Sequence, residues 1–204
     1  MRFLSRALSF AAILLFIGAF TLQANAQSVL KNNEVSISAF WQRTPSVTGN
    51  DVTVDATRSI GFQGAFRHSY HWWLGYEGSY NWARYSEHYS SARPHAVQHN
   101  MHEFGASYLI SGASVLGFRP FALGGISAVV FSPTLNGGQN VSWQGEPGIN
   151  FGAGIDRALL TSHFGVRLQY RGVYYRTPDF GEPQLKSDKY RLTSEPMAGL
   201  YLRF

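Results

Sequence analysis

The sequence predicts an all-β fold, an eight-stranded antiparallel up-and-down barrel, and three observations lead to this class. Large apolar residues alternate with small or polar residues along eight stretches of the chain. The connections between these stretches are alternately long and short. Only 14% of the 204 residues are charged, whereas 15% are aromatic, and an ordinary soluble domain carries about 25% charged residues. We therefore expect much of the protein surface not to face water.

The first 26 residues have the layout of a cleavable signal peptide. Arg2 and Arg6 precede an apolar stretch over residues 7–20, and Ala24-Asn25-Ala26 supplies the small residues of a cleavage site. A membrane helix would need about 20 apolar residues, and this stretch is shorter. We therefore assign residues 1–26 to the signal peptide and residues 27–204 to a single barrel domain.

The composition of the mature chain excludes several classes of protein. Without the signal peptide the chain has 15 basic and 12 acidic residues, and this net charge of +3 is too small and scattered for a nucleic-acid binder. The chain has no cysteine, so disulfides, thiolate metal sites and cysteine nucleophiles are ruled out. No stretch of 18 apolar residues occurs after the signal peptide, which excludes a membrane-spanning helix there.

Alternation with a period of two residues marks the eight strands. Their expected ranges are 34–43, 59–67, 72–84, 101–110, 119–131, 148–157, 164–175 and 190–204. Long connections are expected at 44–58, 85–100, 132–147 and 176–189, and shorter ones at 68–71, 111–118 and 158–163. Long loops at one end and short turns at the other are typical of a transmembrane β-barrel, whose strands need about 9–11 residues to cross.

The size of the side chains decides which face of each strand points outward. An eight-stranded barrel has a lumen just wide enough for side chains to fill, and the bulky residues of stretch 72–84 would overfill it, whereas Gly75, Ser79 and Ala83 fit. The bulky face should therefore meet hydrocarbon. Membrane-facing aromatic residues are expected at Trp72, Tyr76, Tyr80, Trp82 and Tyr174. The alternative is a secreted lipocalin-like barrel, in which the aromatic residues would line a cavity for a hydrophobic ligand.

Residues 27–204 resemble the small OmpA/OmpX-type eight-stranded outer-membrane barrels. The most specific part is the end of the chain, Met197-Ala-Gly-Leu-Tyr-Leu-Arg-Phe204, where Gly199, Leu202 and Phe204 match the signal read by the barrel-assembly machinery. Met197 departs from the usual polar residue. The resemblance implies a monomer in a Gram-negative outer membrane, with long loops outside and both termini in the periplasm. Its implied partners are outer-membrane lipid and lipopolysaccharide, and during biogenesis the assembly machinery and periplasmic chaperones.

The inward face carries charges of both signs, which should pair because isolated buried charges are costly. If Tyr175 lies opposite Arg191, antiparallel counting places Arg171 opposite Glu195. We expect a lumen ion-pair network formed by Arg171, Glu195, Glu77, Arg167 and Glu103. It would act as a plug that fixes the register or as a gate in a narrow conduit. The plug is favoured, because eight strands enclose too little space for an aqueous channel.

The connection at 85–100 is rich in basic side chains. The surface-loop candidates are Arg84, His88, Arg93, His95 and His99, and they would contact lipopolysaccharide phosphates or a host polyanion. The histidine spacing matches no zinc pattern, so neither a metal nor a cofactor is expected.

A catalytic role has little support in the sequence. The close His/Ser neighbours are His68-Ser69, in an expected turn, and His88 with Ser90, in an expected loop without a fixed partner. The sequence therefore predicts an outer-membrane β-barrel with a structural, envelope-integrity or adhesin-like role through its extracellular loops. The alternatives are a narrow conduit, a lipid A-modifying acyl hydrolase or transferase, and the lipocalin-like binder.

Overall fold

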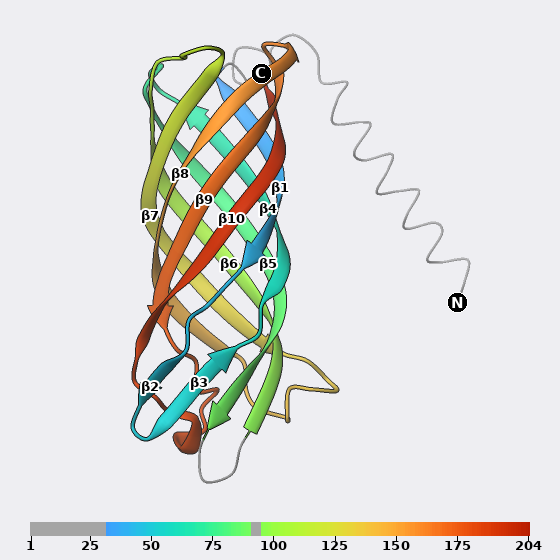
Figure 1. Cartoon of the computed structure of the whole chain (residues 1–204), viewed down its shortest axis with the longest axis vertical. Helices are drawn as coiled ribbons and strands as arrows, with labels where there is room; N and C mark the ends of the chain where they lie inside the picture. The colour runs from blue at the N-terminus through green and yellow to red at the C-terminus, as the bar shows by residue number, and fades with distance from the viewer. Residues whose placement is uncertain (1–31, 91–94) are drawn as a thin grey trace, which may run out of the picture. The chain divides into compact units, whose positions relative to one another are not determined.

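The computed structural model describes residues 32–90 and 95–204, and in this part of the chain eight strands close into a barrel (Figure 1). The barrel strands are β1 (Asn33–Gln42), β4 (Ser59–Ser69), β5 (Leu74–Ser90), β6 (His95–Ser111), β7 (Phe118–Pro133), β8 (Gln144–Thr161), β9 (Phe164–Arg176) and β10 (Tyr190–Arg203). The predicted class and strand number are confirmed. The predicted signal peptide lies outside the described residues.

Each barrel strand pairs antiparallel with its neighbour along the chain, and the ring is closed by β1 and β10. In this seam Glu34 lies opposite Arg203, and Ile37 lies opposite Leu200. Gly199 faces the same seam, where an added Cβ would collide with the carbonyl oxygen of Ile37. Closure gives every barrel strand two hydrogen-bonded neighbours, as a lipid environment requires.

The connections separate the two ends of the barrel. Short turns at residues 70–73, 112–117 and 162–163 occupy one end, which we call the turn end, together with the start of β1 and the finish of β10. The longer connections at 43–58, 134–143 and 177–189 occupy the opposite end, which we call the loop end. The predicted alternation of short and long connections is therefore confirmed for these segments.

The connection at 43–58 contains a hairpin that the sequence analysis missed. Strands β2 (Val47–Gly49) and β3 (Val52–Ala56) are joined by Asn50 and Asp51, whose φ angles are 51° and 60°. Such angles define the tight turns that suit hairpins, and Asn and Asp tolerate them better than most residues. Strand β3 then pairs with the tip of β5, so the hairpin continues the sheet beyond the ring (Figure 1).

The prediction of a long loop at 85–100 is wrong, because β5 continues to Ser90 and β6 already starts at His95. Alternation persists there: Tyr85, Glu87 and Tyr89 point inward, and the outward residues between them are polar. Only 3% of Tyr85 is exposed, so its ring lies in the lumen rather than at the membrane interface. At the other end of β5, Trp72 lies in the turn rather than in the strand.

The two faces of the barrel wall differ sharply in chemistry. Tyr76, Leu168 and Leu200 are 37%, 54% and 45% exposed on the outer face. The inner face instead buries arginines and carboxylates beside glycines and small polar residues. An apolar outer band around a polar interior is the pattern of a transmembrane barrel and the reverse of a lipocalin-like one. The described helices include none that is long and apolar enough to cross a membrane.

Candidate functional site

The first group of interior charges lies near the turn end. Arg67 Nε donates to Glu77 Oε2 at 2.5 Å, and these residues face each other on β4 and β5. Arg167 donates to both oxygens of Asp156 at 2.7 and 2.8 Å and also to Glu34. All five residues are buried. Two arginines and three carboxylates thus compensate one another across strands that are far apart in the sequence.

The second group lies farther along the lumen and is centred on Arg171. Its Nη1 and Nη2 atoms donate to the two oxygens of Glu103, each at 2.6 Å, and Nη1 lies 3.0 Å from Glu195 Oε2. Asn81 Nδ2 also donates to Glu103, at 2.9 Å. The register places Arg171 opposite Glu195, as the antiparallel counting expected. An arginine that binds one carboxylate in bidentate fashion and contacts a second forms a strong, geometrically specific contact, and all three side chains are buried.

The third group lies toward the loop end. The Arg191 guanidinium pairs with Glu87, and His99 Nε2 lies 3.8 Å from the same carboxylate. The hydroxyl of Tyr89 lies 2.8 Å from Glu87 Oε2 and 2.8 Å from the carbonyl oxygen of Pro178, so its single proton can be donated to either oxygen. These four side chains are buried.

Segment 177–189 closes the loop end of the lumen, and we call it the cap. It contains the short helix η2 (Pro183–Leu185). Its Phe180 and Leu185 side chains are 1% and 0% exposed, and the Phe180 ring packs 5.4 Å from the His99 ring and 6.3 Å from the Phe131 ring. Backbone N–H groups of Asp179 and Phe180 donate to the side-chain oxygen of Gln144. The lumen is therefore filled by three charge groups and covered by an apolar lid.

The cap is also tied to the β2–β3 hairpin. Asn50 Nδ2 donates to Asp188 Oδ2 at 3.0 Å, and Arg176 forms an ion pair with the same carboxylate. The hydrogen bond from Asn50, reinforced by the one from Arg176, holds the pKa of the exposed Asp188 carboxyl below its usual range. These contacts join the hairpin, the end of β9 and the cap at the loop end.

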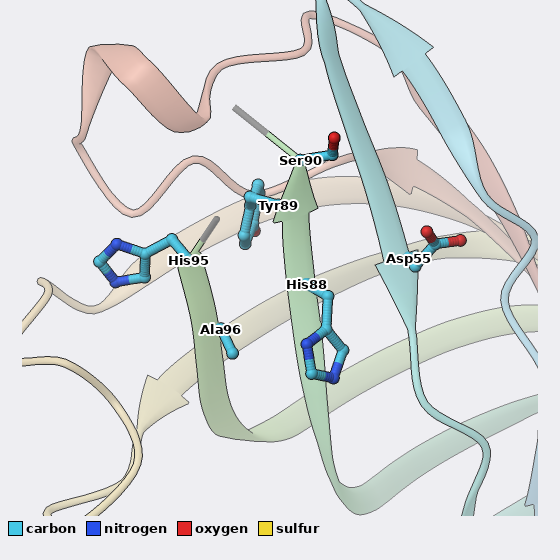
Figure 2. A pocket seen from close by; sticks show the side chains of 6 residues that line it. All are labelled: Asp55, His88, Tyr89, Ser90, His95 and Ala96. Carbon is cyan, nitrogen blue, oxygen red and sulfur yellow. The ribbon is translucent and has the colours of Figure 1, made fainter. Parts of the chain in front are cut away.

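A cleft of about 370 Å³ opens between the tips of β3, β5 and β6 (Figure 2). Its lining residues are Asp55, His88, Tyr89, Ser90, His95 and Ala96. The expectation that His88 and Ser90 lie in a loop is wrong, since both lie on β5. In Figure 2 the His88 ring points away from the Ser90 hydroxyl, and Asp55 accepts a hydrogen bond from Ser46. No Ser/His/acid relay joins these groups within the described residues.

The surface-loop candidates have separate locations. Arg84 and His88 lie exposed on β5, and His95 starts β6. The expectation that His99 lies at the surface is wrong. Its side chain lies inside the barrel with 0% exposure, because His99 occupies one of the alternate positions of β6 whose side chains point inward. Arg93 lies outside the described residues. The described part of the chain contains no group of three or more His, Cys, Asp or Glu residues placed to hold a metal ion.

The other predicted residues can be placed on the two faces of the wall. Tyr76, Tyr80 and Tyr174 are exposed on the outer face, and Trp82 is half-buried there. Trp72 is 67% exposed in its turn. Sequence reasoning missed the cap residues Phe180 and Leu185, which follow Pro178 and flank Pro183 in a stretch without alternation.

An antiparallel barrel of eight strands, with an apolar outer band and a charged interior, defines a transmembrane barrel of the outer-membrane class. The model of the outer membrane protein beta-barrel domain family matches residues 12–193, and the chain belongs to this family. The protein is therefore located in the cell outer membrane, where short turns face the periplasm and long loops the exterior. The turn end is thus periplasmic and the loop end extracellular.

Solved structures with the same fold come from several bacteria. Neisserial surface protein A, NspA, has a TM-score of 0.61 and 17% identity, with 85% of this chain and 98% of that chain covered. OprG from Pseudomonas aeruginosa has a TM-score of 0.60 and 10% identity, covering 85% and 96%. Ail of Yersinia pestis has a TM-score of 0.50 and 16% identity, covering 85% and 99%. No curated protein matches the sequence significantly.

Proposed function

We propose that this protein is a closed, non-conducting outer-membrane barrel that acts in surface interaction through a rigid extracellular platform. We define the platform as the β2–β3 hairpin together with residues 84–90 of β5 and 95–100 of β6. One observation carries the proposal. Strands β5 and β6 continue as regular strands toward the exterior beyond Trp82 and Phe104, their last large outward apolar residues, and β3 pairs with this part of β5.

The interior supports the non-conducting part of the proposal. In this reading the predicted network of Arg171, Glu195, Glu77, Arg167 and Glu103 is a structural plug. Glu77 and Glu103 are each held by an arginine, at 2.5 and 2.6 Å. Opening a path for ions would separate buried partners, and breaking a buried pair costs about 3–5 kcal/mol. The apolar cap residues Phe180 and Leu185 add a second barrier at the loop end.

The outer face of the platform supports the interaction part. Outward positions beyond Trp82 are Arg84, Ser86, His88 and Ser90, which are polar in place of the apolar residues below them. A sheet extension fixes such side chains at little entropic cost, unlike a flexible loop. The structure of Ail, an attachment invasion locus protein, was solved with the heparin analogue sucrose octasulfate. By analogy of fold we propose an adhesin-like role for this platform, with a polyanionic surface as the contact.

Conductance recordings and an adhesion assay test the two parts separately. The folded barrel in planar bilayers should give no stable openings, and regular openings would contradict the plug. For the platform, the outward basic residues are replaced in the variant Arg84→Gln/His88→Gln, and the matched control Arg176→Gln/Lys186→Gln removes basic residues elsewhere at the same end. Cells with the first variant should lose adhesion to heparin-coated surfaces, whereas the control should keep it. Equal adhesion of both variants and the wild type would refute the adhesin-like role.

A further inference from the structure

A groove on the outer wall of the barrel lies apart from the platform and the lumen. It has a volume of about 290 Å³ and is lined by Trp41, Arg43, Arg58, Tyr170, Ser194 and Pro196. These residues come from β1, β9, β10 and the segment that leads into β4. Small-molecule pockets start at about 300 Å³, so this groove has room for part of a larger ligand rather than for a whole one.

The groove spans the border between the apolar band and the polar loop end. Trp41 pairs with Ile60 in the β1–β4 register, and both are exposed on the outer face, at 50% and 68%. The next outward positions on these two segments are Arg43 and Arg58, which are also exposed. Because the loop end is extracellular, the groove lies where acyl chains meet headgroups in the outer leaflet.

The two arginines of the groove have no acidic partner among the described residues. The salt bridges of this part of the chain leave out Arg43 and Arg58, whereas Arg176 at the same end pairs with Asp188. The Arg58 guanidinium lies 5.8 Å from the centroid of the Trp41 ring, at cation–π distance. This contact leaves the N–H donors at the edge of the guanidinium free to bind an anion.

The rest of the groove is held rigidly. Arg43 and Ser194 exchange two backbone hydrogen bonds of 3.0 and 2.8 Å, so the base of the Arg43 side chain is fixed beside β10. The Tyr170 hydroxyl donates to Ser194 Oγ at 2.9 Å, and the Tyr170 ring, 55% exposed, forms an apolar wall with Pro196. The groove therefore combines two cations at the edge toward the loop end with apolar walls toward the membrane.

We propose that this groove binds one phosphorylated glycolipid of the outer leaflet, of the lipid A class. A phosphate would accept hydrogen bonds from Arg43 and Arg58, and an acyl chain would lie against Tyr170, Pro196 and the face of Trp41. Guanidinium groups bind phosphate oxygens with charge-assisted hydrogen bonds, and these are strongest where water is scarce. The site is independent of the proposed platform, because it uses none of the platform residues and faces the membrane.

Native mass spectrometry of the full-length barrel in detergent tests the site with bisphosphorylated lipid A as the probe. The wild type should retain one bound lipid A per barrel. The double variant Arg43→Gln/Arg58→Gln should bind it at least about tenfold more weakly, since each hydrogen bond to a charged group that is lost weakens binding by roughly this factor. The Arg43→Lys/Arg58→Lys variant should lie between them, because lysine keeps the charge but not the paired donors.

The matched control is Arg157→Gln/Lys186→Gln, which removes the same charge from two cations outside the groove and the platform, one stacked on Phe118 and the other beside Asp188. It should stay within about twofold of the wild type, as expected for residues outside the contact. Resistance of each folded variant to SDS before boiling verifies the barrel. The proposal is overturned if the control loses as much affinity as the groove variant. It is also overturned if dephosphorylated lipid A binds as tightly as the bisphosphorylated form.

Discussion

Arg171 and Glu103 join two strands that are not neighbours in the barrel. β9 and β6 are separated by β7 and β8, yet two hydrogen bonds of 2.6 Å connect these side chains across the lumen. The same guanidinium also contacts Glu195 on the adjacent strand β10 at 3.0 Å. Backbone hydrogen bonds in the barrel connect only adjacent strands. The Arg171–Glu103 contact therefore adds a cross-link between two strands that the sheet does not join directly.

We expect Arg171→Met to destabilise the folded barrel by about 3–5 kcal/mol, because Glu103 and Glu195 would remain buried without their partner. Reversible urea unfolding in lipid vesicles, followed by tryptophan fluorescence, measures this loss. The control is Glu195→Gln, which keeps the Arg171–Glu103 pair and should lose less than half as much. A loss below about 1 kcal/mol for Arg171→Met would show that the cross-lumen pair adds little stability.

The outer face gives a second prediction. Ile126 is 70% exposed near the middle of the apolar run of β7, so Ile126→Arg places a cation in hydrocarbon and should cost about 2–4 kcal/mol. The same unfolding assay in vesicles measures the change. Leu135→Arg is the matched control, since Leu135 is 99% exposed in segment 134–143 and should tolerate the charge. Equal stability of the two variants would contradict the assignment of the outer face to lipid.

The contact between the hairpin and the cap should depend on pH. Asn50 and Arg176 lower the pKa of Asp188 in the folded state, so the stabilisation is fully present above the unfolded value of about 3.9. This stabilisation is lost as the pH falls through the pKa that Asp188 has in the folded protein, which is lower than the pKa in the unfolded chain. The protection of the β2–β3 hairpin amides, which is the exchange rate relative to the intrinsic rate at the same pH, should therefore be high at neutral pH and lower in strong acid. Asp188→Asn should exchange fast even at neutral pH, and unchanged protection in this variant would refute the link.

The sequence predicted those parts of the structure that depend on neighbouring strands. Period two identified the eight strands and their outer faces, and antiparallel counting placed Arg171 opposite Glu195. The same counting across a 68–71 connection would have placed Arg67 opposite Trp72, whereas its partner in the structure is Glu77, because the turn lies at 70–73. The contact of Arg171 with Glu103 was not predictable in this way, because it depends on how far the register shifts around the closed ring.

The predictions that failed concern the ends of β5 and β6, which extend beyond the membrane-spanning part of the barrel. There the residues that point inward and outward differ in type from those in the membrane. In the extension of β5 the inward residues are Tyr85 and Tyr89, and the outward residues are polar, so the pattern of bulky-out and small-in reverses. His99 was assigned to the surface for the same reason. Asn50-Asp51 carried a usable signal for a hairpin turn, since both residues tolerate positive φ.

The pairing of β1 with β10 has a consequence for how the protein is made. Glu34 in the first barrel strand meets Arg203 in the last, so an incomplete chain always leaves two strand edges exposed. Such a fragment would be poorly tolerated in hydrocarbon and prone to aggregate in water. Insertion must therefore wait until synthesis has delivered the final strand, and until then the chain depends on being kept unfolded.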